Sequence, residues 1–433
     1  MDFLRLPEGS VTLTNLTVPA CLIGKSGTPA ADLVRIDLTL KDGRIAAPDG
    51  SLPRIDMKGA MVFPSFIDMH THLDKGHIWP RAANPDGSFM GALTTVEADR
   101  IANWSGADVR ARMDFALRCA YAHGTSAIRT HLDAIPPQHR ISFAEFTRLR
   151  EEWAGRIELQ AACLTSIDRI DPEGGGEFAE LADLVAETGS VLGCVTFPDA
   201  QLSDRLRAFF AHAGKRGLHA DFHADETTDP SVATLRAIAE TVLETGYDAP
   251  VVVGHCCSLS VQPEAEAMHT LDLVARAGIN IVSLPMCNLY LQDRTAQDAP
   301  ARTPRLRGVT LVHEMAARGI NVSFASDNTR DPFYAYGDLD MIEVMREATR
   351  IAHLDHSRDD WVKAFLTNPA TTTGFAQPSL DAGAPADLVI CRARSWTELF
   401  ARPQSDRIVI RQGRQIDRTL PDYAELDHLM DRT

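Results

Sequence analysis

The feature that most constrains the fold is a His-Thr-His motif at residues 70–72, at the end of an apolar run. The run includes Met61, Phe63 and Ile67 and is typical of a buried strand. Side chains alternate along a strand, so His70 and His72 would project to the same side. Such a pair offers two nitrogen ligands to one metal ion. The chain has 15 histidines, and an ordinary structural pair is the alternative interpretation of this spacing.

Seven further apolar segments follow, separated by longer helical patterns. The eight strand candidates are residues 63–72, 126–133, 157–166, 191–198, 218–225, 251–258, 280–286 and 321–328. Residues 107–123 repeat apolar side chains at helical spacing and end before Gly124, a typical helix stop; similar patterns cover 203–216, 230–244 and 263–277. Eight strand–helix units over about 300 residues predict an α/β fold, a (β/α)₈ TIM-like barrel. A doubly wound open sheet is the alternative.

Both ends of the chain are predicted to be rich in short strands. The N-terminal candidates are residues 11–18, 33–40, 44–47 and 54–58, and the C-terminal candidates are 386–391, 406–411 and 414–416. Lys41-Asp42-Gly43-Arg44 is a hairpin signal. We therefore expect a small β-sandwich built from both termini, with residues 1–62 and 375–433 on either side of a barrel at 63–374.

The composition limits the kinds of partner that the protein is expected to bind. The formal net charge is −16, from 43 basic and 59 acidic residues, without a basic stripe, so neither nucleic acid nor a membrane is expected to bind. The eight cysteines form no Cys-x-x-Cys pair, which indicates reduced thiols and a cytoplasmic protein. No signal-peptide pattern opens the sequence, and no apolar run reaches the roughly 20 residues of a membrane span. The oligomeric state stays open, a homo-oligomer included.

Polar side chains recur where the predicted strands end. In a (β/α)₈ barrel these ends meet at the face that carries the chemistry. The residues are His70 and His72, His223 with Asp225 and Glu226, His255, and Asp327 with Asn328. Three histidines and one aspartate suit Zn²⁺ or Fe²⁺ with an open position for water. Taken singly, His255 also fits a core histidine and Asp327 a helix cap, but four strand ends with suitable residues favour one site.

These motifs resemble the amidohydrolase superfamily, and within it the cytosine deaminase-like group. The matching segments are FIDMHTHLDK at 66–75, RTHLD at 129–133, HADE at 223–226, GH at 254–255, NLYLQDR at 288–294, RGVTLVHEMAARGINV at 307–322 and SDNTRDPF at 326–333. The resemblance implies a metal-dependent deaminase of a cyclic amidine or aminated heterocycle. The alternatives are an amidohydrolase that cleaves a cyclic amide or an N-alkylamine substituent, and a non-catalytic scaffold that keeps the fold.

The resemblance also implies roles for individual residues. His70, His72, His223 and Asp327 would hold one divalent ion, Zn²⁺ or Fe²⁺. His255 would hydrogen-bond the metal-bound hydroxide, and Glu226 would carry a proton to a ring nitrogen of a small heterocyclic substrate. The fourth strand ends at residues 196–198 without the lysine that bridges two metals in some superfamily members, so a mononuclear site is expected.

The chemistry of hydrolysis agrees with this assignment. A metal lowers the pKa of bound water to about 7, and the reaction needs an acid and a base, roles that Glu226 and Asp327 fit. Contact with the cation would keep Asp327 ionised, so only Glu226 is expected to need a raised pKa.

Departures from cytosine deaminases fall on the expected substrate contacts. Ser166 stands where those enzymes carry glutamine, Asn328 where they have a second aspartate, and Phe333 where they have tryptophan. With Gln292 and His131, these residues are the candidate substrate contacts. Cytosine is therefore predicted to be a poor substrate. Ser-Asp-Asn at 326–328 also resembles the N-isopropylammelide amidohydrolases, which lack the glutamate that this chain keeps at 226.

Smaller features have two interpretations each. Lys75 either steers a substrate or is a solvated loop lysine. Trp79, Phe89 and Trp104 are candidates for a lid over the pocket. Cys256 and Cys257 are adjacent, and packing is favoured over a disulfide.

Overall fold

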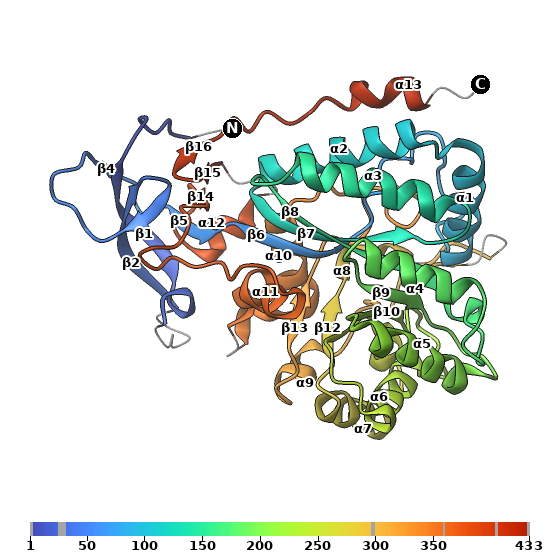
Figure 1. The fold of residues 1–433 in the computed structure, drawn as a ribbon. Helices are drawn as coiled ribbons and strands as arrows, with labels where there is room; N and C mark the ends of the chain where they lie inside the picture. Colours follow the sequence, from blue (N-terminus) through green and yellow to red (C-terminus); the bar gives the residue numbers. More distant parts are fainter. Residues whose placement is uncertain (1–2, 25–31, 296–298, 358–359, 403–405, 431–433) are drawn as a thin grey trace.

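The structure is a computed structural model that describes residues 3–24, 32–295, 299–357, 360–402 and 406–430. It contains two sheets of eight strands each. One sheet combines strands from both ends of the chain, and the other is surrounded by the helices of the central part (Figure 1).

The central sheet is parallel and follows chain order from β6 to β13. Its strands are β6 (Phe66–Thr71), β7 (Thr125–Asp133), β8 (Glu158–Ser166), β9 (Leu192–Val195), β10 (Ala220–Ala224), β11 (Val251–His255), β12 (Asn280–Ser283) and β13 (Val322–Phe324). Just beyond β13, the Asp327 N–H donates to the His70 carbonyl at 2.9 Å, and Asp327 bridges Thr71. The last strand therefore returns to the first, which confirms the barrel and excludes the open sheet.

Helices connect and cover these strands. They are α1 (Phe89–Asn103), α2 (Gly106–His123), α3 (Gln138–Glu152), α4 (Glu177–Glu187), α5 (Leu202–Arg216), α6 (Thr234–Thr245), α7 (Glu264–Arg276), α8 (Pro285–Leu291), α9 (Val312–Ala316), α10 (Met341–Ala352) and α11 (Thr367–Thr373). The predicted stop of α2 is confirmed, since Gly124 has φ +100°. A Cβ atom there would lie 2.3 Å from Val389 of the first sheet, so only glycine suits this contact.

The first sheet joins the two ends of the chain. Its strands are β1 (Val11–Pro19), β2 (Leu33–Lys41), β3 (Arg44–Ala46), β4 (Arg54–Asp56), β5 (Met61–Pro64), β14 (Leu388–Cys391), β15 (Arg407–Arg411) and β16 (Arg414–Gln415). β5 pairs antiparallel with β14, Phe63 opposite Val389, and Leu13, Leu388 and Ile410 belong to the core cluster of this sheet. The single strand predicted over residues 63–72 is wrong, because the chain passes at Ser65 from one sheet to the other.

After β16 the chain leaves the first sheet and crosses α2 to α13 (Asp427–Met430), drawn in red in Figure 1. Leu426 packs against Phe115 and Cys119 of α2. Farther back, the Tyr423 hydroxyl donates to Asp338 at 3.0 Å. The C-terminal segment therefore packs against α2 of the barrel.

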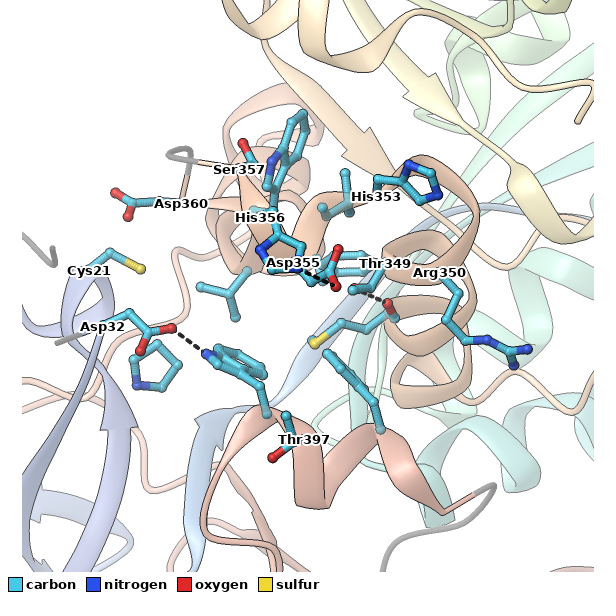
Figure 2. A pocket seen from close by; sticks show the side chains of 18 residues that line it. Cys21, Asp32, Thr349, Arg350, His353, Asp355, His356, Ser357, Asp360 and Thr397 are labelled. Atoms are coloured by element: carbon cyan, nitrogen blue, oxygen red, sulfur yellow. Dashed lines mark hydrogen bonds and ion pairs between the residues drawn. The ribbon is translucent and has the colours of Figure 1, made fainter. Parts of the chain in front are cut away.

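A cavity of about 720 Å³ lies between the first sheet and the outside of the barrel. Figure 2 shows Asp32 and Thr397 at its edge, with His353 and Asp355 opposite. It is lined partly by α10 and by α12 (Trp396–Ala401), and the Trp396 indole donates to Asp32 at 2.6 Å. None of the site residues predicted above lines it. In the described part of the chain, no helix combines the length and apolar character of a membrane span.

Candidate metal centre

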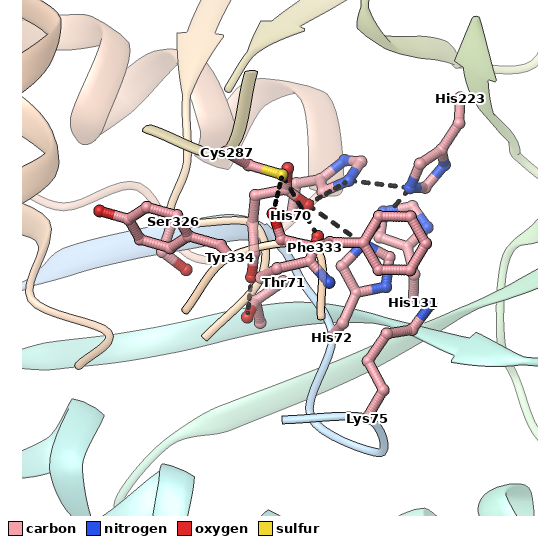
Figure 3. Close-up of polar contacts among 12 residues, drawn as sticks. His70, Thr71, His72, Lys75, His131, His223, Cys287, Ser326, Phe333 and Tyr334 are labelled. Carbon is pink, nitrogen blue, oxygen red and sulfur yellow. Dashed lines mark hydrogen bonds and ion pairs between the residues drawn. The ribbon is translucent and has the colours of Figure 1, made fainter. Parts of the chain in front are cut away.

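Four predicted ligands meet at the C-terminal end of the barrel, and Figure 3 shows three of them, His70, His72 and His223, pointing toward one another. The His223 Nε2 atom lies 3.1 Å from His70 Nε2 and 3.4 Å from His72 Nε2. Asp327 Oδ1 lies 3.2 Å from His72 Nε2 and 3.6 Å from His70 Nε2. β6 supplies His70 and, one residue past its end, His72; β10 supplies His223, and the chain after β13 supplies Asp327.

These four side chains fit a divalent metal ion. Ligands about 2.1 Å from a shared tetrahedral ion lie about 3.4 Å from one another, close to the distances found here. Both carboxylate oxygens of Asp327 are buried without a hydrogen-bond partner among the described residues. Burial holds the pKa of His70, His72 and His223 well below the ordinary value, which keeps the imidazoles in the neutral form that binds metals.

Burial also raises the pKa of the Asp327 carboxyl. A cation at the point where the four side chains meet would supply the missing counter-charge and keep Asp327 ionised. The expectation that Asp327 stays ionised therefore depends on that cation.

Three strand ends hold unusual backbone conformations. Asp225, His255 and Asp327 have φ values of 56°, 69° and 63°, in the left-handed region that non-glycine residues seldom adopt. Such residues cluster at functional sites, where the surrounding structure holds them. At Asp225 the carboxylate accepts hydrogen bonds from the Thr234 and Leu235 N–H groups. It therefore caps α6, while Glu226 follows on the same turn.

Glu226 and His255 lie side by side. Glu226 Oε1 is 3.5 Å from His255 Nδ1, and the Asn288 amide donates to the same nitrogen at 2.9 Å. Burial raises the pKa of Glu226 well above its ordinary value, with Asp327 adding to the effect. The raised pKa expected for Glu226 is present. Asn288 was not predicted as a site residue, although it lies in the segment NLYLQDR that carries part of the family resemblance.

Lys75 lies inside the molecule. Its side chain is 6% exposed and pairs with Asp133 at 2.8 Å, and its ammonium lies 5.3 Å from the centre of the Phe333 ring. The interpretation as a solvated loop lysine is therefore wrong. Phe89 meets Phe333 edge to face, with ring centres 5.5 Å apart, so one candidate lid residue reaches a candidate substrate contact.

The remaining candidate contacts differ in position. Asn328 donates to Asp331 at 2.8 Å and lies 3.6 Å from the Cys287 thiol, so protein groups engage its amide at both atoms. The centre of the His131 ring lies 4.0 Å from that of His70, with the ring planes tilted by 39°, within the histidine cluster. Ser166 ends β8, and Gln292 lies beside Gly308. Among the described residues, no side-chain hydrogen bond or ion pair joins either one to the histidine cluster.

The burial of side chains bears on two further expectations, the aromatic lid and the adjacent cysteines. Trp104 is buried and donates to Asp99 at 2.8 Å, so it belongs to the helical layer and not to a lid. All eight cysteines are free, and Cys256 and Cys257 are buried, in agreement with packing. Trp79 is half-buried, and its N–H donates to the Arg330 carbonyl.

Comparison with known proteins gives a consistent result. The amidohydrolase family matches residues 122–417. Over 437 residues the sequence is 54% identical to pterin deaminase from Rhizobium rhizogenes, with 98% of each chain covered. It is 23% identical to N-isopropylammelide isopropyl amidohydrolase from Pseudomonas sp., over 84% of this chain and 87% of that protein. The solved structure of 5-methylcytosine deaminase from Klebsiella pneumoniae matches with a TM-score of 0.78 at 24% identity, covers 95% of this chain and 98% of its own, and shares the fold.

Proposed function

The chain belongs to the amidohydrolase family and is a hydrolytic deaminase of heterocycles, and we propose that its substrate is a pterin. The observation that carries the proposal is the 54% identity to a pterin deaminase over 98% of the chain. In the reaction, water replaces the amino group: a C–O bond forms, the C–N bond breaks, and ammonia leaves.

The residues of the site support this chemistry. A divalent metal held by His70, His72, His223 and Asp327 would supply ionisation of water near neutral pH. Asp327 would collect a proton from the attacking water, and Glu226 would deliver one to the ring nitrogen beside the reacting carbon. The raised pKa of Glu226 suits that second role, because it favours the protonated form that donates the proton.

The proposed substrate fits the departures from cytosine deaminases. A pterin carries its amino group on a carbon between two ring nitrogens, in a flat system of two fused rings. Phe333 is smaller than the tryptophan of cytosine deaminases and leaves more room, and Phe89 adds a second aromatic edge. Ser166, Gln292, Asn328 and His131 stay candidate substrate contacts.

Ammonia release tests the proposal. Purified protein with one equivalent of metal is assayed on pterin, cytosine, 5-methylcytosine and N-isopropylammelide, with the His223→Ala variant as the control for background. We expect kcat/KM for pterin of about 10⁴ M⁻¹s⁻¹ or more, and a value for cytosine at least about 100-fold lower. A cytosine value equal to or above the pterin value would contradict the proposal, as would release of isopropylamine without deamination.

The finer assignments follow from the same premise. The ion is Zn²⁺ or Fe²⁺, because three imidazoles and a carboxylate suit both. The eight free cysteines support a reducing, cytoplasmic setting. We expect the working partner to be the small heterocycle and no nucleic acid, with a homo-oligomer as the assembly to test.

A further inference from the structure

The Nδ1 atom of His255 has two polar neighbours from different elements. The Asn288 amide nitrogen, on α8, lies 2.9 Å away and donates a hydrogen bond to it. Glu226 Oε1, beyond β10, lies 3.5 Å away. The other ring nitrogen, Nε2, is buried and has no hydrogen-bond partner among the described residues.

The identity of the Nδ1 partner determines what Nε2 can do. A neutral imidazole has one N–H donor and one acceptor nitrogen. When Asn288 donates to Nδ1, Nδ1 is the acceptor and the proton lies on Nε2. An ionised Glu226 in the place of Asn288 would instead accept a proton from Nδ1 and leave Nε2 as an acceptor.

His255 lies directly beside the metal centre. Its ring centre is 5.0 Å from that of His223 and 5.6 Å from that of His70, and the three residues have ligand atoms within 4.8 Å of one another. An Nε2–H group in this position is a donor facing the place where the nucleophilic water is expected.

Asn288 is held firmly. It is 1% exposed, and its N–H donates to the Leu284 carbonyl in the first turn of α8. The preceding residue, Cys287, contacts Asn328 and the Phe333 carbonyl. α8 is therefore attached to the loop that follows the metal ligand Asp327, and the Asn288 amide has little freedom to turn away.

We propose that Asn288 is a positioning residue that fixes His255 as the Nε2–H tautomer. By occupying Nδ1 it also keeps the neighbouring Glu226 carboxyl from pairing with His255, so that Glu226 stays free for the substrate. The tautomer depends only on contacts within the protein, whereas its catalytic consequence rests on the proposed deaminase function.

The test uses metal-loaded full-length protein labelled with ¹⁵N-histidine. The signal of His255 is identified by its loss in His255→Gln, and its two nitrogen shifts report the tautomer without substrate. Asn288→Asp keeps the size of the side chain but replaces the donor by an acceptor. Asn280→Asp, at the start of β12, is the matched control for placing a carboxylate in the same strand–helix unit away from the site.

We expect Nε2–H in the wild type and in Asn280→Asp, and Nδ1–H in Asn288→Asp. We further expect kcat of Asn288→Asp to fall at least tenfold while metal content and KM stay near wild type. An Nδ1–H signal in the wild type would overturn the inference, as would an unchanged tautomer in Asn288→Asp. If Asn288→Asp does not fold, the wild-type signal and loss of a single tautomer in Asn288→Ala decide the question. A wild-type protein with the Nε2–H tautomer and no ammonia release would contradict the proposed function and leave the inference standing.

Discussion

The barrel interior contains two layers of polar side chains that lie two residues apart on the same strands. The charges of the two layers are balanced in different ways. In the lower layer, Arg129 of β7 donates to Asp221 of β10 at 2.9 Å and to Gln160 at 2.7 Å. In the upper layer, His131 and His223 occupy the same two strands. All four side chains on β7 and β10 are buried, so burial alone does not separate the layers.

The two layers differ in the source of the positive charge that balances the buried carboxylate. The protein itself provides it below, where a guanidinium faces a carboxylate. Above, the imidazoles of His70, His72 and His223 converge with the carboxylate of Asp327. Neither oxygen of that carboxylate has a hydrogen-bond partner in the described part of the chain. One oxygen of Asp221 also lacks a hydrogen-bond partner among the described residues, but its charge is paired with Arg129. A buried carboxylate without a cation is costly, so the upper layer fits a metal ion. The lower layer is expected to serve stability, and the upper layer to serve the reaction.

The largest expected effect comes from removing a ligand in the upper layer. His223→Ala should lose both bound metal and deaminase activity, because the remaining ligand set is incomplete. Its unfolding free energy should match that of metal-free wild type, since the Arg129–Asp221 pair is untouched. Metal analysis, ammonia assays and urea unfolding check these points; a variant that kept its metal and its turnover would remove the distinction between the layers.

The next effect concerns a group beside the upper layer that is not a ligand. Glu226→Gln should lower kcat by about 10²–10⁴, the usual share of general acid–base catalysis, because an amide cannot carry the proton. Metal content should stay at about one equivalent per chain, which separates this variant from His223→Ala. Full turnover in Glu226→Gln would disprove the assigned proton transfer.

The lower layer should respond in the opposite sense. Arg129→Met leaves Asp221 buried without its cation, and we expect a loss of about 3–5 kcal/mol in the free energy of unfolding with bound metal retained. The double variant Arg129→Met/Asp221→Leu should recover much of that loss, because it removes both charges. Urea titrations at matched metal loading measure both. A strong loss of metal affinity in a folded Arg129→Met would mean that the layers do not act separately.

The smallest effect is expected at the ion pair between Arg407 of the first sheet and Asp340 at the start of α10. Burial alone would raise the pKa of Asp340, but Arg407 of β15 outweighs it and holds that pKa well below its ordinary range. Since the folded pKa lies below the unfolded one, the pair stabilises the protein above about pH 4 and loses this contribution as the pH falls.

Asp340→Asn keeps the side-chain cap of α10 but loses the charge. It should cost about 2 kcal/mol at pH 7 and flatten the acid dependence of stability, with kcat unchanged. Unfolding measured between pH 3 and pH 7 tests this, with Asp338→Asn as the half-buried neighbour for comparison. An acid dependence equal to wild type would show that Asp340 does not carry it.

Most residues of the upper layer could be predicted from the sequence, because strand alternation and strand ends can be recognised in short segments. Strand periodicity places His70 and His72 on one side, and the barrel brings strand ends together, so His223 and Asp327 followed. The lower layer escaped notice because Arg129 and Asp221 lie inside apolar segments, 92 residues apart. Nothing local in the sequence indicates that these two charges pair.

Other failures have the same origin. Lys75 follows a ligand strand and resembles a loop lysine until Asp133 and Phe333 are brought against it. Asn288 lies on the short helix α8, and its partner His255 is on another strand. The roles of Lys75 and Asn288 both depend on partners distant in sequence.

We expect the upper layer to hold one metal ion and the lower layer none. The most direct measurement is the metal content per chain of purified wild type, His223→Ala and Arg129→Met, determined by inductively coupled plasma mass spectrometry. We expect about one equivalent in the wild type, none in His223→Ala and about one in Arg129→Met, consistent with a single N₃O site. Two equivalents in the wild type, or one retained in His223→Ala, would contradict it.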